Sequence, residues 1–440
     1  MDVSAHALWQ VVAAALIFIV CFGLMITGLF NRLLVVWAGA LLMLLLGLVS
    51  GTEVVQTHIG WQTIFLMIGI MVLSGITGKT GLYEYITIRC AQKTGGRYFL
   101  LLVALAVIAA VGSAALDAVT TMMVMIPMTI RLAKRLNANP FSLLVTVMAS
   151  GTIGGSATMI GSIPNMMIGS SQAAGLTFNG FLVHVAPLSV LCFAVIVLVL
   201  YRLYAKEWKP DPAHISELMA LDASSFLSNR TLLVKACAVW GLTLLGFLFQ
   251  LQLRIPIGFI ALAGALVLVL ISVRKKEDLV EIGHSVEWGT LGWLAGLFIL
   301  VGGLADTGIM EAIALKGMEL TSGNPMLLAL LVLWVSAIGS AVVDQAIVAA
   351  SLIPLVKQWG IQLEITTYWQ LNPVWWSLSI GASLGGMATW LGSQASLVAA
   401  GLALKEGHEL SLKRYVKVAV PLTLLVLLIS TLYIVLMYFD

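Results

Sequence analysis

The sequence predicts an all-α polytopic membrane protein built from two inverted repeats. Each repeat is expected to contain five transmembrane helices plus one re-entrant hairpin, with a broken helix in each half. Composition, long apolar runs and an internal duplication lead to this prediction. Of the 440 residues, 60% are hydrophobic and 10% charged, and the mean hydropathy is +1.05, whereas soluble domains carry roughly a quarter charged residues. The net charge of +3 provides no basic face for nucleic acid.

Eight apolar runs have the length of about 20 residues that a helix needs to cross roughly 30 Å of hydrocarbon. No basic segment precedes the first run, so it is predicted to be a membrane span and not a signal peptide. The runs are 8–29, 33–50, 61–78, 186–204, 231–250, 255–273, 288–305 and 416–438.

Two longer regions contain a duplicated motif. Ala-Val-Gly-Ser-Ala-Ala-Leu-Asp at 110–117 aligns with Ala-Ile-Gly-Ser-Ala-Val-Val-Asp at 337–344, an offset of 227 residues. At an offset of 231, Gly-Gly-Ser-Ala-Thr at 154–158 aligns with Gly-Gly-Met-Ala-Thr at 385–389. An odd number of crossings in each half inverts the second half relative to the first. Inverted repeats of this kind are typical of secondary transporters.

The predicted division of the chain follows from these spans. The first repeat covers 1–204, a cytoplasmic linker 205–230, and the second repeat 231–440. The hairpins are placed at about 98–135 and 325–359, and the broken helices at about 141–180 and 373–404. With the N-terminus outside, 20 Lys and Arg residues fall on the cytoplasmic side, Arg32 among them, and three on the other side, namely Arg254, Lys316 and Lys357. By the positive-inside rule, both termini are therefore predicted on the exterior side of the cytoplasmic (inner) membrane.

Asp117 and Asp344 are the candidate proton-coupling residues. Each ends one copy of the motif at a predicted hairpin tip, ten residues before Pro127 or Pro354. An Asp there can cap the returning helix, which would be a purely structural role. A charged Asp at bilayer depth costs about 2.5–3.5 kcal/mol, however, and Ser or Asn would cap without that cost. Burial disfavours the charged form, so we favour reversible protonation during transport.

The predicted substrate site joins the hairpin tips to the helix breaks. Glycines let the backbone leave the helix, and the freed polar groups can bind an ion; close helix packing is the alternative explanation for the glycines. The candidate binding residues are Thr120, Thr121, Thr158, Ser162, Asn165, Gln345, Thr389, Ser393 and Ser396. The residues expected to form the breaks are Gly154, Gly155, Gly161, Pro164, Gly385, Gly386 and Gly392.

The segment 151–170, Gly-Thr-Ile-Gly-Gly-Ser-Ala-Thr-Met-Ile-Gly-Ser-Ile-Pro-Asn-Met-Met-Ile-Gly-Ser, resembles the signature of the ion transporter superfamily. That group includes arsenite-efflux permeases, bacterial Na⁺/H⁺ antiporters of the D type and, more distantly, divalent anion/sodium symporters. The resemblance covers nearly the whole chain. It implies a fold with two hairpins on two scaffolds, and a homodimer.

Relatives in the antiporter branch typically carry Asp or Asn where this chain has Ala118, Ser162 and Met387. Hard cations need several oxygen ligands, so Na⁺ coordination is depleted. The sequence therefore favours proton-coupled efflux of arsenite or antimonite, a small inorganic ion or metalloid. Na⁺/H⁺ antiport is the alternative, a carboxylate or other anion the third reading, and a channel the different class.

An enzyme is not expected, because the chain has no HExxH or GxSxG motif and its six His residues fall in loops or at span ends. Nor does the sequence suggest a cofactor or a resident metal.

Overall fold

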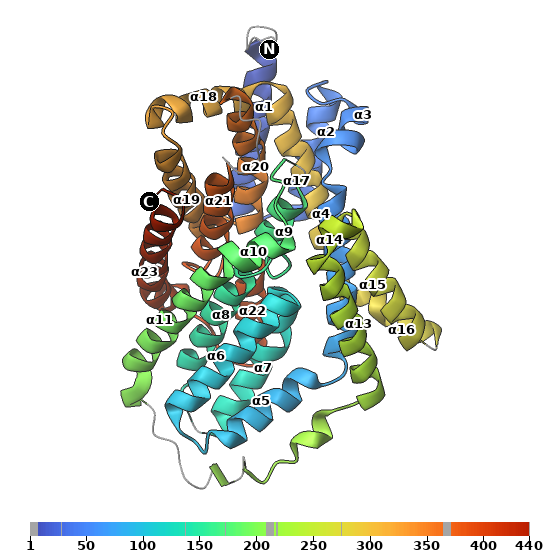
Figure 1. Cartoon of the computed structure of the whole chain (residues 1–440), viewed down its shortest axis with the longest axis vertical. Coiled ribbons are helices and arrows are strands. Elements are labelled where there is room, and N and C mark those ends of the chain that lie inside the picture. Colours follow the sequence, from blue (N-terminus) through green and yellow to red (C-terminus); the bar gives the residue numbers. More distant parts are fainter. Residues whose placement is uncertain are drawn as a thin grey trace.

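The computed structural model describes residues 8–27, 29–136, 138–171, 173–207, 215–216, 219–273, 275–363 and 371–439 (Figure 1). Throughout these ranges the secondary structure is helical, without a β-strand. The chain is therefore an all-α protein, as the sequence predicts. Among the described residues, eight helices are long and apolar enough to cross a membrane.

The first half contains ten α-helices of at least seven residues. They are α1 (Leu8–Thr27), α2 (Arg32–Leu45), α4 (Trp61–Gly78), α5 (Leu82–Lys93), α6 (Tyr98–Ala115), α7 (Ala118–Arg135), α8 (Pro140–Ser156), α9 (Ile163–Ser170), α10 (Phe178–His184) and α11 (Ala186–Tyr204). The short α3 (Gly51–Glu53) and the π-helical η2 (Val54–His58) connect α2 to α4.

The second half follows a similar order. Its helices are α13 (Arg230–Leu248), α14 (Gln250–Leu253), α15 (Ile257–Ser272), α16 (Lys276–Ser285), α17 (Trp288–Asp306), α18 (Ile309–Thr321), α19 (Pro325–Val342), α20 (Gln345–Gln362), α21 (Asn372–Gly385), α22 (Gln394–Lys405) and α23 (Leu412–Tyr438). The predicted linker between the halves lies partly outside the described residues and contains the 3-10 turns η3 (Ala205–Glu207) and η4 (Ala223–Phe226).

Asn, Pro and Gly residues mark several helix ends. Asn139 accepts a hydrogen bond from the Phe141 amide, and Pro140 occupies the first helical position of α8, where a missing N–H costs nothing. α2 ends at Leu45 and so has 14 residues, fewer than the apolar run at 33–50 suggests. Gly47, two residues beyond the helix, has a φ of 67°, a left-handed conformation that favours glycine.

The two hairpins have matching construction. α6 and α7 are joined by Leu116 and Asp117, and α19 and α20 by Val343 and Asp344. Each returning helix contains the predicted proline, Pro127 or Pro354.

Two amphipathic helices, α5 and α18, precede the hairpins and were not expected from the sequence. They correspond through the offset of 227 and lie at opposite ends of the molecule, α5 at the bottom and α18 at the top of Figure 1. That placement agrees with inverted halves, although the orientation of each half in the membrane stays a prediction.

The halves interlock through their third long helices. α4 packs on α15 of the second half, and α17 packs on α2 of the first. These two helices are the most buried of the eight candidate spans, with 61% of their apolar window covered, whereas α1 has 17%. α1 therefore presents its Leu, Ile and Val side chains outwards, which suits contact with lipid.

Each broken helix lies directly against the first helix of its hairpin, α8 on α6 and α21 on α19. A Cβ at Gly154 would collide with the backbone of Ala110, and one at Gly385 with the backbone of Ala337. Close packing thus accounts for these two glycines, which the sequence analysis assigned to helix breaking.

We expect Gly154→Ala and Gly385→Ala each to destabilise the protein by about 1–3 kcal/mol, because backbone atoms cannot move aside for the new methyl group. Thermal unfolding of the purified protein in detergent measures the effect. Gly401→Ala is the matched control, since Gly401 lies inside α22 with no atom near a built Cβ. Unchanged unfolding midpoints for the first two variants would contradict the packing account.

Candidate functional site

The two hairpin tips and the two helix breaks meet at a cavity of about 30 Å³. This volume holds about two water molecules. Asp117, Ser162 and Gln345 of the predicted site line it, together with Gly161 and Gln394. The remaining lining residues are Met67, Ile70, Met71, Ala118, Val119, Ile163, Met166 and Ala395. The wall is therefore largely apolar, with a few polar groups.

Asp117 is held at the start of α7 and is 8% exposed. Its Oδ1 accepts a hydrogen bond of 2.8 Å from the Thr120 amide, so the residue does cap the helix. Its Oδ2 is buried without a hydrogen-bond partner in the described part of the chain. The Ser74 hydroxyl lies nearby, but it too makes no hydrogen bond within the usual limits. Capping thus uses one carboxylate oxygen and leaves the other available.

Asp344 has different surroundings, although the sequence makes it equivalent to Asp117. Its Oδ1 accepts from the Ala346 amide at 2.9 Å, and its Oδ2 lies 3.5 Å from Nη1 of Arg32. The Asp344 side chain is 1% exposed and the Arg32 side chain 32%. Arg32 was expected in a cytoplasmic loop, and no Arg or Lys falls within the motif regions. Its pairing with Asp344 joins residues more than 300 positions apart, and no local sequence signal indicates it.

Two threonines attach the breaks to the hairpins. The Thr158 hydroxyl donates to the Ala114 carbonyl at 2.6 Å, and the Thr389 hydroxyl donates to the Ala341 carbonyl at 2.8 Å. Neither threonine lines the central cavity. Their hydroxyl protons are committed to the fold, which gives both residues a positioning role.

Asn165, also predicted to bind substrate, is fully buried and fully hydrogen-bonded. Its Nδ2 donates to the carbonyls of Ser156 and Thr158, each at 2.9 Å. Its Oδ1 accepts from Ser379 at 2.7 Å and from Ser383 at 3.0 Å. The amide therefore fastens the first break to α21 of the second half.

The other predicted residues make local contacts. Ser162 shares a hydrogen bond of 3.1 Å with Ser383. The Thr121 hydroxyl pairs with that of Tyr83 at 3.2 Å. Ser393 accepts from the Ser396 amide at 3.1 Å and caps α22. Pro164 lies in the first turn of α9.

The glycines at the two breaks approach each other. A Cβ at Gly155 would lie 2.6 Å from the Gly161 carbonyl oxygen, and one at Gly386 2.8 Å from that of Gly392. Close backbone approach across each break therefore requires glycine in both halves.

Asn165→Asp is expected to destabilise the protein by about 3 kcal/mol, because a buried carboxylate would face two carbonyl oxygens without a donor between them. Thermal unfolding in detergent provides the measurement. Asn324→Asp is the control, since Asn324 is exposed and caps α19 by accepting from the Met326 and Leu327 amides, a role that Asp fills equally well. Equal unfolding midpoints for the two variants would show that the Asn165 contacts do not hold the halves together.

Comparison with known proteins gives the family. The family described as "Citrate transporter" (CitMHS) matches residues 22–381. The chain belongs to this family. It is thus a multi-pass membrane protein and a secondary transporter.

Relatives in the CitMHS family align over most of the chain. An uncharacterized transporter of Mycobacterium tuberculosis is 33% identical, over 97% of this chain and 99% of the relative. The 46 kDa membrane protein of Mycobacterium leprae is 30% identical with the same coverage. The human P protein is 29% identical over 94% of this chain and 58% of its own length.

Two solved structures share the fold. The YdaH transporter of Alcanivorax borkumensis superposes with a TM-score of 0.62 at 15% identity, over 87% of this chain and 86% of that one. MtrF of Neisseria gonorrhoeae, described among antimetabolite efflux pumps, gives a TM-score of 0.60 at 14% identity, over 88% and 83%. At these identities the likeness concerns the fold alone.

Proposed function

We propose that this CitMHS-family transporter couples solute movement to protons, with Asp117 as the proton carrier. The observation that carries the proposal is the position of Asp117, which lines the cavity where all four motifs meet and whose buried Oδ2 has no hydrogen-bond partner in the described part of the chain. Among the described residues, none forms a salt bridge with this carboxylate. An ionised carboxylate without a counter-charge is costly in such a site. A proton or a bound solute would remove that cost.

Asp344 is proposed to act differently. The Arg32 guanidinium next to it stabilises the ionised carboxylate, so Asp344 would remain charged through the cycle. Both aspartates were predicted from the sequence to couple protons. The proposal keeps that role for Asp117 and gives Asp344 the task of holding the second hairpin tip against the start of α2.

Asp117→Asn should abolish uphill transport but retain exchange of substrate across the membrane, because the amide can cap α7 yet cannot carry a proton. Arg32→Gln should lower stability, because it leaves the buried Asp344 carboxylate without a counter-charge. Asp344→Asn should lower it less, because the Arg32 side chain that it leaves alone is partly exposed. The double variant should recover part of that loss. Reconstituted vesicles with an imposed pH gradient, and thermal unfolding in detergent, provide the readouts.

Uphill transport by Asp117→Asn at the wild-type rate would refute the role of Asp117. Strictly additive effects of Arg32→Gln and Asp344→Asn on the unfolding midpoint would refute the stabilising role of the Arg32–Asp344 ion pair. These two outcomes are independent, so one can fail without the other.

Arsenite or antimonite, exported against protons, is the proposed substrate. Two features support a small, weakly charged species: the volume of about 30 Å³ and a wall with few polar groups. A neutral metalloid hydroxide can hydrogen-bond to Asp117, Ser162 and the amides of Gln345 and Gln394. Membership of the family described as "Citrate transporter" favours a second candidate, a carboxylate such as citrate. Na⁺/H⁺ antiport and a channel are the remaining alternatives, and the homodimer stays a prediction.

Proteoliposomes with a pH gradient should accumulate arsenite or antimonite above equilibrium and ignore Na⁺, because oxygen ligands for a dehydrated Na⁺ are few. The solutes to offer are arsenite, antimonite, citrate, Na⁺ and Li⁺, with Asp117→Asn vesicles as the matched control. Uphill citrate uptake would replace the metalloid by the carboxylate. Na⁺-dependent dissipation of the pH gradient would favour the antiporter, and strictly downhill flux would favour a channel.

A further inference from the structure

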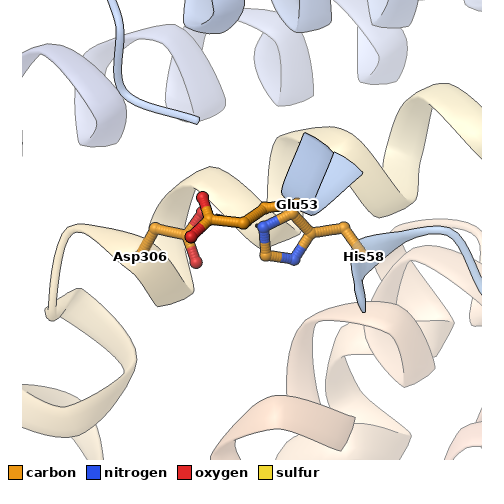
Figure 2. Close-up of side chains that lie close together, drawn as sticks. All are labelled: Glu53, His58 and Asp306. Carbon is orange, nitrogen blue, oxygen red and sulfur yellow. Dashed lines mark hydrogen bonds and ion pairs between the residues drawn. The ribbon is translucent and has the colours of Figure 1, made fainter. Parts of the chain in front are cut away.

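A second and much larger cavity, of about 840 Å³, lies among η2, α4, α9, α17 and α20. It is called the vestibule below. Three side chains of its wall converge at one place: Glu53 from α3, His58 from the end of η2 and Asp306 from the end of α17 (Figure 2). Their ligand atoms all lie within 4.8 Å of one another. None of these three residues lines the central cavity that contains Asp117.

The imidazole of His58 is held in a defined position. Its Nε2 lies 2.7 Å from Oδ2 of Asp306. The ring also packs over Gly302 of α17, where a Cβ would collide with it. The His58 side chain is 12% exposed and that of Asp306 29% exposed, so the pair is partly shielded but open to the vestibule.

Glu53 is the third member of the cluster. One of its carboxylate oxygens, Oε2, accepts a hydrogen bond of 2.8 Å from Ser50, the residue that caps α3. Glu53 and His58 belong to the first half and Asp306 to the second. The cluster therefore bridges the two halves at the wall of the vestibule.

The duplication offers an internal comparison. Position 306 corresponds to Lys79 through the offset of 227; Lys79 directly follows α4, and Asp306 is the last residue of α17. Lys79 forms an ion pair of 3.0 Å with Glu281 of α16. The first contact joins the end of α4 to α16, which precedes α17. The second joins the end of α17 to η2, which precedes α4. A Lys–Glu pair is complete without a further ion, whereas His with two carboxylates is a set of metal ligands.

We propose that Glu53, His58 and Asp306 bind a divalent transition-metal ion, with Zn²⁺ as the representative. Zn²⁺ takes imidazole nitrogen and carboxylate oxygen in a four-coordinate site, and water or another group of the vestibule would supply the fourth ligand. The ion takes the place of the hydrogen between Nε2 of His58 and Oδ2 of Asp306, and the neutral imidazole carries its one N–H on Nδ1. Mg²⁺ and Ca²⁺ prefer all-oxygen sites and should compete poorly. The site needs no particular transport substrate.

Untagged full-length protein in detergent should bind one Zn²⁺ per chain in competition with a chromophoric chelator. Glu53→Gln, His58→Gln and Asp306→Asn should each weaken binding at least tenfold. Glu311→Gln is the matched control, because Glu311 lines the same vestibule outside the cluster. X-ray absorption of the bound Zn²⁺ should show one imidazole ligand.

Three results would overturn the proposal. They are an unchanged affinity in Glu53→Gln and His58→Gln, an equal loss in Glu311→Gln, and displacement of Zn²⁺ by equimolar Mg²⁺ or Ca²⁺. If His58→Gln or Asp306→Asn fails to fold, Glu53→Gln decides, since Glu53 is exposed and its substitution disturbs little of the core. Transport assays are not needed for this test, so its outcome is separate from that of the proton-coupling proposal.

Discussion

Backbone that leaves helical geometry deep in a membrane protein must find other partners, and this requirement organises the centre of the molecule. The breaks between α8 and α9 and between α21 and α22 satisfy this requirement through hydrogen bonds to the hairpins. Thr158 and Thr389 donate to hairpin carbonyls, and the Gln345 amide donates to the Gly392 carbonyl at 3.0 Å. Each hairpin and its neighbouring break are consequently fastened together, with the small cavity enclosed between the two sets.

The two halves share this construction but not their charges. Asp344 has Arg32 beside it, and Asp117 has an unpartnered oxygen. Lys79 pairs with Glu281, while Asp306 faces His58. The two halves keep the same contacts between hairpin and broken helix although their charged residues differ, because glycines and threonine hydroxyls make those contacts.

The sequence was a good guide to local features and a poor one to distant partners. Apolar length and Asn, Pro and Gly residues located most helices, because these signals act over a few residues. Each copy of the duplicated Asp motif ends at a two-residue connection, between α6 and α7 or between α19 and α20. α5 and α18 were missed because they carry too many polar residues to resemble spans. The pairing of Arg32 with Asp344, and the hydrogen bonds of Asn165 to α21, depend on contacts between segments more than 200 residues apart. A single sequence offers no means of pairing such residues.

The size of the central cavity bears on how coupling could arise. With room for about two water molecules, the central cavity cannot hydrate an ionised Asp117 as bulk water does. Under the proposed coupling, this state would be favoured when Asp117 is protonated or when a solute donates a hydrogen bond to Oδ2, and disfavoured when the carboxylate is charged and empty. A ligand shifts a conformational equilibrium only by its difference in affinity between the states. Proton and solute would each supply such a difference at the same oxygen, so they would compete for one carboxylate and move in opposite directions.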